Sequence, residues 1–315
     1  MKIVYIFTSA VVSYFLLNLL KPFFIRNFLD KPNDRSSHNI SKPSGAGIIF
    51  SGLTSISSLL ALLIDGFSRI YFLPLLILPL SLVGLIDDKY KLPAYLRFFI
   101  QIFTAILLIQ ISDLANLQGF TQLLIICFLI ISIVSIINFT NFMDGSDGLV
   151  ASCMLLMIGN LVLNLSLSLP LLVLLGTIIG FLFMNWHPSK IFMGDSGSTY
   201  LGAIFSGLLL QTNSWLEALS YLLVGFPLFA DATTCLIRRI IKKQKIFRPH
   251  RLHLYQRLIR SGWSHDKVAL LYCSATFLIL LTNQFRNIHL TISIIMFEAI
   301  LAYFLETRIS AKFND

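Results

Sequence analysis

Length, composition and charge together exclude an ordinary soluble protein. Of the 315 residues, 56% are hydrophobic and only 12% are charged, whereas soluble domains carry about 25% charged residues. The net charge of +9 would suit nucleic acid, but the basic residues stand between apolar runs. Membrane lipid headgroups and phosphorylated ligands are therefore the expected partners, and no nucleic acid is expected.

Apolar runs that could cross a bilayer recur from Ile3 to Thr307. One span needs about 20 apolar residues, and hydropathy with charge breaks indicates about eleven spans. They lie near 3–20, 44–64, 70–86, 95–112, 122–139, 149–167, 170–185, 197–213, 216–236, 267–283 and 289–305. No cleavage signature follows the first run, so we expect a retained helix. The sequence predicts one all-α polytopic membrane domain over residues 1–315.

Basic residues predict the orientation of these spans. All but three of the 24 lysines and arginines fall on one side, the exceptions being Lys2, Arg69 and Arg286. By the positive-inside rule that side is cytoplasmic, which places the N-terminus in the periplasm and the C-terminus in the cytoplasm. The loops expected on the cytoplasmic side are 21–43, 87–94, 140–148, 186–196 and 237–266.

Two adjacent aspartates, Asp87 and Asp88, close the third span on the cytoplasmic side. Neighbouring helical residues point about 100° apart, so the pair can address two partners, such as a metal and a phosphate or basic side chain. The alternative is a solvated charged cap. Two aspartates together in so weakly acidic a chain favour a functional role.

A row of polar side chains ends the fifth span. Asn138, Asn141, Asp144 and Asp147 recur at three-residue intervals, which gives a slowly winding stripe on a helix or tight turn. Such amides and carboxylates can bind the hydroxyls and base edges of a nucleotide and touch a hydrated Mg²⁺. Helix capping is the alternative, but it explains one aspartate and not four residues.

Asp195 stands where the eighth span begins. The amides that follow it would form a helix N-terminus favourable to phosphate. A carboxylate beside a diphosphate is repelled unless a cation lies between them, and Mg²⁺ binds few carboxylates together with phosphate oxygens and water. Capping alone is again the alternative.

The longest cytoplasmic loop carries His250, Arg251 and His253. These side chains can contact phosphate by charge-assisted hydrogen bonds, whereas the basic residues 238–245 before them are typical of topology signals and headgroup contacts. Asp231, which precedes this loop, is either a buried helix-end carboxylate paired with an arginine or another acid of the site. The four cysteines lie in apolar runs without CxxC spacing or a nearby histidine, so packing is expected and zinc is not.

Together these segments resemble the bacterial polyprenyl-phosphate N-acetylhexosamine-1-phosphate transferases, a glycosyltransferase family that includes WecA and MraY. The resemblance covers most of the chain in order: Arg35-Ser-Ser-His38, Asp87-Asp88, Asn141-Phe-Met-Asp144-Gly-Ser-Asp147-Gly, Phe192-Met-Gly-Asp195-Ser-Gly-Ser and the histidine loop. Eleven spans and a lone Asp-Asp pair resemble the WecA branch. Relatives carry His-x-His-His where this chain reads His253-Leu-Tyr255-Gln256, which resembles WbpL-type enzymes and leaves the donor sugar open.

The resemblance implies roles for particular residues. Asp87 and Asp88 would engage the acceptor lipid phosphate, Asp195 would bind Mg²⁺, with Asp88 as a second candidate ligand and Mn²⁺ as an alternative ion, and Asn141, Asp144 and Asp147 would hold the nucleotide. Asn138, His250, Arg251 and His253 complete the predicted donor site. The implied location is the bacterial inner membrane with a cytoplasmic active site, and a homodimer is left open.

The sequence thus predicts transfer of an N-acetylhexosamine-1-phosphate, or a 6-deoxy analogue, from a UDP-sugar to undecaprenyl phosphate with release of UMP. The product would start a lipid-linked glycan such as O-antigen. Two other functions are weighed against it. A cation-coupled lipid or sugar transporter would need acids around a central cavity, and an inactive assembly scaffold would not need the polar row together with Asp195.

Overall fold

The structure, a computed structural model, describes residues 1–315 except 31–40, 113, 115–119, 245–249, 286 and 314–315. The described chain is nearly all helix and confirms the all-α expectation, apart from one antiparallel pair of very short strands, β1 (Leu29–Asp30) and β2 (Lys42–Pro43). The helices are α1 (Lys2–Asn27), α2 (Gly47–Asp65), α3 (Arg69–Tyr90), α4 (Ala94–Gln110), α5 (Phe120–Met143), α6 (Leu149–Leu165), α7 (Leu169–Asn185), α8 (Gly194–Leu209), α9 (Trp215–Val224), α10 (Phe226–Ile241), α11 (Leu254–Arg260), α12 (His265–Gln284), α13 (Ile288–Phe304) and the π-helical turn η1 (Leu305–Ile309).

Many helices are long and apolar enough to make this a multi-pass membrane protein. Within the described residues six helices meet both criteria, and the bent pair α9 and α10 gives a seventh if it counts as one span. Three further apolar helices, α4, α6 and α7, have 17 residues each. These three helices are shorter than the about 20 residues of a typical span, and the expected count of eleven spans is not confirmed.

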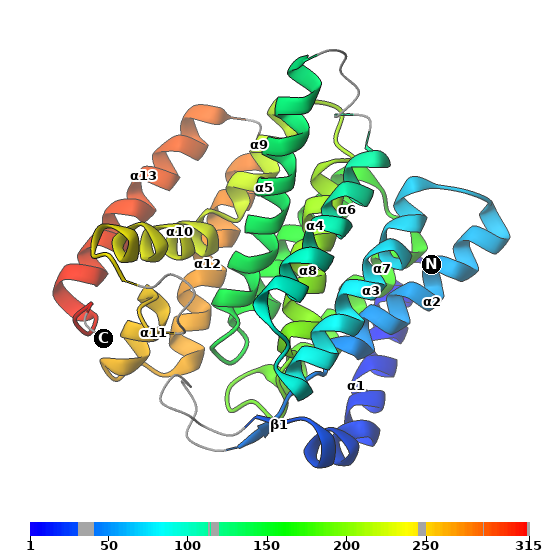
Figure 1. The fold of residues 1–315 in the computed structure, drawn as a ribbon, viewed down its shortest axis with the longest axis horizontal. Helices are drawn as coiled ribbons and strands as arrows, with labels where there is room; N and C mark the ends of the chain where they lie inside the picture. The colour runs from blue at the N-terminus through cyan, green and yellow to red at the C-terminus, as the bar shows by residue number, and fades with distance from the viewer. Residues whose placement is uncertain (31–40, 113, 115–119, 245–249, 286, 314–315) are drawn as a thin grey trace.

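The expected span at 216–236 is broken. Helices α9 and α10 meet at Gly225 with an angle of 82°, and Figure 1 shows α10 lying across the other helices. Pro227 stands in the first turn of α10, where proline is tolerated because its missing amide would have no helical partner. The break carries the chain sideways toward α11 and the histidine loop.

Helix α8 lies at the centre of the bundle, packed against α2, α3, α5 and α6 (Figure 1). Its residues from Ser196 to Leu209 are all buried. Two glycines on neighbouring helices allow this packing: a Cβ on Gly47 would lie 2.1 Å from the Cα of Gly197, and one on Gly84 would lie 2.6 Å from the amide nitrogen of Ser196. Small residues let helix backbones approach closely, so the ends of α2 and α3 meet the start of α8.

Backbone hydrogen bonds fix this junction from the side of the sheet. Phe192 donates its amide to the carbonyl of Pro43 at 2.8 Å and accepts from the amide of Ala46 at 3.1 Å. Gly47 in turn donates to the carbonyl of Met193 at 2.9 Å. The starts of α2 and α8 are thereby tied together where the predicted site residues stand.

Candidate active site

The two adjacent aspartates at the end of α3 point to different partners, as expected. Asp88 accepts a hydrogen bond from the amide of Asp195 at 2.9 Å and a longer one from the amide of Ser196 at 3.4 Å. A Cβ on Gly194, whose φ is +70°, would lie 2.2 Å from Asp88 Oδ2, so glycine gives both the backbone conformation and the space. Asp88 therefore caps α8, and those two amides are not free for a phosphate. Of the amides after Asp195 that the sequence predicts to face phosphate, that of Ser196 is therefore occupied, and the phosphate contact itself stays a prediction.

Asp87 is buried and points toward α4. It accepts from the amide of Leu92 and, at 3.1 Å, from the guanidinium of Arg97. The same nitrogen of Arg97 lies 3.6 Å from Asp195 Oδ2. Arg97 thus stands between two carboxylates and offsets their mutual repulsion. Sequence reasoning missed Arg97, although a lone basic residue ten positions after Asp87 was the available signal.

The four residues of the polar row do not act alike. Asn138 exchanges hydrogen bonds with Gln101 on α4, at 2.7 Å and 3.4 Å, and so joins α4 to α5. Asn141 accepts from the hydroxyl of Ser198 on α8 at 2.8 Å. The structure therefore separates Asn138, which supports the bundle, from Asn141, which lies beside the start of α8.

Asp147 is buried in a network of donors. It accepts from the amide of Ser189 at 3.0 Å and its hydroxyl at 2.7 Å, and from His187 at 2.8 Å, while the Lys42 ammonium lies 3.4 Å away. Burial by itself would raise the pKa of Asp147, but these hydrogen bonds outweigh it and hold the pKa below the usual value. Both oxygens accept hydrogen bonds from the loop before α8, so Asp147 holds that loop in position.

Asp144 is different, because none of the described residues donates a hydrogen bond to its side chain. Burial first, then the negative charges of Asp88 and Asp147, raise the pKa of Asp144 to about 8. Neighbouring carboxylates destabilise the ionised form of Asp144, and no hydrogen-bond donor among the described residues offsets this. A cation or the hydroxyl groups of a ligand would therefore stabilise the ionised form.

The histidine loop is anchored by Asp231. This aspartate accepts from the amides of Leu254 and Tyr255, at 2.8 Å and 3.2 Å, and from the hydroxyl of Tyr272 at 2.7 Å. It therefore caps α11, and His253 lies next to it with Nδ1 3.7 Å from Asp231 Oδ1. In the described residues Asp231 thus accepts hydrogen bonds from these donors rather than from an arginine, which was one of the two alternatives left open by the sequence.

Helix α11 also contacts the polar row. The hydroxyl of Tyr255 donates to the carbonyl of Phe142 at 3.1 Å, and a Cβ on Gly145 would lie 2.2 Å from that hydroxyl oxygen. Gly145 thus makes room for Tyr255. The start of α11, which follows His250 and Arg251 in the chain, is therefore held beside the turn that carries Asp144, while the donor site itself stays a prediction.

Two sequence predictions have a different outcome. The motif Arg35-Ser-Ser-His38 lies outside the described residues. Cys235 has histidine neighbours after all, because His250 and His253 place their ligand atoms within 4.8 Å of its thiol and of each other. The sequence could not show this contact, which the fold creates between α10 and the following loop.

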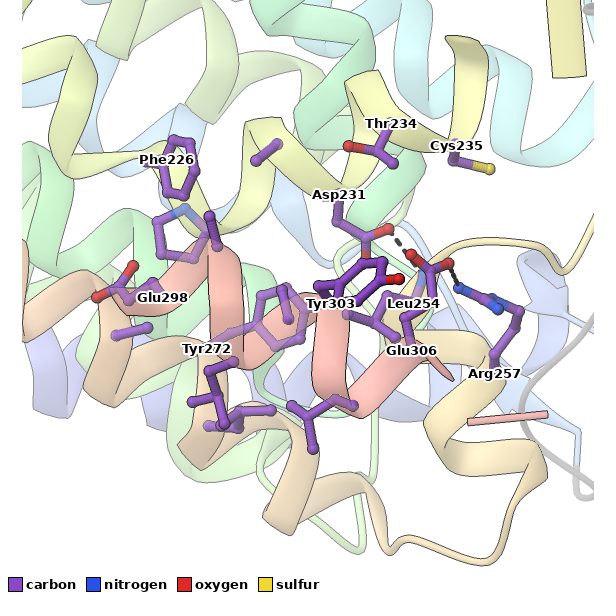
Figure 2. Close-up of a pocket in the computed structure, with 18 of the residues that line it drawn as sticks. Phe226, Asp231, Thr234, Cys235, Leu254, Arg257, Tyr272, Glu298, Tyr303 and Glu306 are labelled. Atoms are coloured by element: carbon purple, nitrogen blue, oxygen red, sulfur yellow. Dashed lines mark hydrogen bonds and ion pairs between the residues drawn. The ribbon is translucent and has the colours of Figure 1, made fainter. Parts of the chain in front are cut away.

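A cavity of about 280 Å³ lies among α10, α11, α12 and α13 (Figure 2). Its walls are mostly apolar, with Asp231, Glu298 and Glu306 among the acidic residues that line it. The aspartates at the junction of α3 and α8 do not line it. The cavity is therefore separate from the acidic site.

The acidic site fits Mg²⁺ by its chemistry. The Asp195 side chain is 26% exposed and paired only loosely with Arg97, and carboxylate oxygens are the hard ligands that Mg²⁺ prefers. Within the described residues these aspartates do not form a set of three ligands within 4.8 Å. Such an arrangement suits Mg²⁺, which takes one or two carboxylates and completes its shell with substrate phosphates and water.

Sequence comparisons identify the family. Residues 70–213 match the glycosyl transferase family 4. The chain is 30% identical over 292 residues to the probable undecaprenyl-phosphate N-acetylglucosaminyl 1-phosphate transferase of Bacillus subtilis (strain 168), which covers 84% of this chain and 80% of that relative. It is 30% identical over 260 residues to the undecaprenyl-phosphate alpha-N-acetylglucosaminyl 1-phosphate transferase of Thermotoga maritima, with 80% and 81% covered.

A more distant match spans nearly the whole chain. The phospho-N-acetylmuramoyl-pentapeptide-transferase of Staphylococcus epidermidis is 24% identical over 326 residues, covering 92% of this chain and 100% of that relative. These matches confirm the resemblance and the expected class of enzyme, a phosphotransferase. The chain belongs to the glycosyl transferase family 4.

Proposed function

We propose that this enzyme transfers an N-acetylhexosamine-1-phosphate, or a 6-deoxy analogue, from a UDP-sugar to undecaprenyl phosphate. The names of the two relatives at 30% identity support this acceptor and an N-acetylglucosamine-type donor. The observation that carries the proposal is the gathering of Asp87, Asp88 and Asp195 at the junction of α3 and α8. The lipid-linked product would begin a glycan such as O-antigen.

The proposed step is a direct displacement. An oxygen of the acceptor phosphate attacks the phosphorus that carries the sugar, the bond from that phosphorus to the bridging oxygen breaks, and UMP leaves with the electron pair. A phosphate monoester has a second pKa of about 6 and is largely ionised at neutral pH. A strong base is therefore unnecessary, and the protein contributes position and charge.

The acidic residues divide this work. Asp195, with Asp88 beside it, would hold Mg²⁺ or Mn²⁺, which supplies charge neutralisation at the donor diphosphate when bound. Arg97 orients Asp87 and Asp195. Asp88 and Asp87 both already accept hydrogen bonds from the protein, which lowers their strength as nucleophiles and favours direct attack over an aspartyl-phosphate intermediate.

The donor would be held between α5 and the histidine loop. Asn141, Asp144 and Arg251 are the side chains proposed to contact the nucleotide and its phosphates. Asn138 and Asp147, whose hydrogen bonds go to Gln101 and to Ser189, would support them, and His250 and His253 would flank Arg251. Eleven spans, a periplasmic N-terminus and an active site on the cytoplasmic face of a bacterial inner membrane complete the proposal.

The test is a turnover assay with membranes that contain the enzyme. A panel of UDP-sugars is supplied with undecaprenyl phosphate, and mass spectrometry identifies the lipid product. We expect one sugar-1-phosphate to be added with Mg²⁺ and release of UMP. Uptake of labelled sugar or lipid into vesicles without conversion would instead establish a transporter. If the protein showed no conversion and no uptake, the scaffold would be the remaining function.

The direct step has its own test. Without undecaprenyl phosphate, radiolabelled UMP should not exchange into the UDP-sugar. Exchange at a rate close to turnover, abolished by Asp87→Asn or Asp88→Asn, would establish a covalent intermediate on that aspartate.

A further inference from the structure

A second cluster of metal ligands lies away from the aspartates at the junction of α3 and α8. Cys235 on α10 and two histidines of the following loop, His250 and His253, bring one ligand atom each within 4.8 Å of one another. All three side chains are partly or fully buried. In the described part of the chain, this is the group of three metal-ligating side chains whose ligand atoms all lie within 4.8 Å of one another.

The ligand atoms point to a particular class of ion. A thiolate with two imidazoles suits Zn²⁺ and related borderline or soft ions, whereas Mg²⁺ takes oxygen ligands. With Zn–S of about 2.3 Å and Zn–N of about 2.05 Å, a tetrahedral site has sulfur and nitrogen about 3.6 Å apart. Because the three ligand atoms already lie within 4.8 Å of one another, they would need to close by no more than about 1.5 Å.

The surroundings favour a cation at this point. Asp231 and Cys235 stand one turn apart on α10, so they share a face (Figure 2). Nδ1 of His253 lies 3.7 Å from Asp231 Oδ1 and is buried without a hydrogen-bond partner in the described residues. A carboxylate beside a ligating imidazole is the outer partner that metal-bound histidines usually have. A Cys235 thiolate and Asp231 together would offset the two positive charges of the ion.

We infer that Cys235, His250 and His253 form a site for Zn²⁺ or a chemically similar transition-metal ion, distinct from the Mg²⁺ site. The ion would tie the histidine loop to α10 and fix Arg251 between its two histidine ligands. The inference goes beyond the proposed reaction and does not depend on it, because metal binding is measured without turnover.

The test uses the purified full chain in detergent, stripped with a chelator and titrated with Co²⁺ in excess Mg²⁺. A cobalt–thiolate bond gives an intense near-ultraviolet charge-transfer band that oxygen ligands do not give. We expect that band at about one Co²⁺ per chain, displaced by Zn²⁺. The control is Cys153→Ala, because Cys153 is also a buried cysteine in a helix but belongs to no such cluster; its titration should match the wild type.

Cys235→Ala should lose the band and bind Zn²⁺ at least about tenfold more weakly, in line with the loss of a ligand. His250→Ala, at a less buried position, should weaken binding to a similar extent and serves if Cys235→Ala fails to fold. Absence of the band in the wild type, or its persistence in Cys235→Ala, would overturn the inference. Neither result bears on sugar-phosphate transfer, which is assayed separately.

Discussion

Two parts of the molecule use an aspartate to cap a helix, and they differ in the charge left over. At the junction of α3 and α8, Asp88 caps α8 while Asp87, Asp144 and Asp195 crowd around it. At the junction of α10 and α11, Asp231 caps α11 and accepts three hydrogen bonds from the described residues.

The difference separates a reactive region from a supporting one. Arg97 pairs with both Asp87 and Asp195, so the first junction has more carboxyl groups than paired cations and offers oxygen ligands to a metal. The second junction satisfies its carboxylate with protein donors, which stabilises the fold. An aspartate caps a helix at both junctions, and the excess of carboxyl groups distinguishes the junction of α3 and α8 as the candidate active site.

The largest effect should come from the first junction. Asp195→Asn keeps the shape of the side chain but removes its charge, so turnover with Mg²⁺ should fall about 10³-fold, equivalent to about 4 kcal/mol. The lipid product is quantified by mass spectrometry, and folding by the thermal midpoint in detergent. Asp65→Asn, at an exposed helix end, is the control. Near-normal activity of Asp195→Asn would remove Asp195 from the site.

Arg97→Ala should have the next largest effect. Without its guanidinium, Asp87 and Asp195 repel each other and lose their orientation, so turnover should fall about 30- to 100-fold. Arg97→Lys keeps the charge and should recover part of the rate. Arg69→Ala, at the opposite end of α3, should be active. If Arg97→Ala turned over like the wild type, Arg97 would be only a surface cation.

Asp147→Asn should affect stability more than chemistry. Its lowered pKa contributes stability above the unfolded-state value of about 3.9, and this is lost as pH falls through the folded-state pKa. At pH 7 the variant should be about 2 kcal/mol less stable, about 30-fold in the unfolding constant. The gap between the thermal midpoints of variant and wild type should begin to narrow below about pH 4 and should close as the pH falls through the lower folded-state pKa. A gap independent of pH would contradict this account.

The smallest effect should separate two arginines near α11. Arg251→Ala should raise the KM for UDP-sugar about tenfold, through loss of a charge-assisted contact with the donor. Arg257 is buried, pairs with Glu306 and donates to the carbonyl of Ala311, so Arg257→Ala should lower the thermal midpoint and leave KM nearly unchanged. Equal changes in KM would mean that the loop acts as a general basic surface.

The sequence was informative where chemistry and position coincide. Asp87, Asp88 and Asp195 each follow or begin an apolar run on the same face, so their proximity could be expected, and the structure brings them together. The break between α9 and α10 had a signal in Gly225 and Pro227 that the hydropathy pattern concealed. Hydropathy also could not show where the central helices begin and end, because a helix that is buried in the bundle is apolar on all sides.

The rest depends on contacts between distant segments. Nothing near Asp147 in the sequence indicates that Ser189 and Lys42 occupy its oxygens. Equally, nothing in the sequence indicates that Cys235 on α10 and His253 in the following loop lie close together. Spacing along one helix predicts which residues share a face, but not which face another helix covers.

The most direct test of the central claim compares Asp195→Asn with Asp231→Asn. For each variant, transfer per folded molecule is measured at saturating UDP-sugar and undecaprenyl phosphate, together with the thermal midpoint in detergent. We predict that Asp195→Asn keeps a midpoint close to the wild type and loses transfer. Asp231→Asn should unfold at a lower temperature and transfer at a rate within about threefold of the wild type. Both oxygens of Asp231 accept hydrogen bonds, whereas an amide has one acceptor oxygen and turns its NH₂ toward a donor, which costs about 1–3 kcal/mol. The reverse pattern, a stable but inactive Asp231→Asn beside an active Asp195→Asn, would contradict the assignment of chemistry to the junction of α3 and α8.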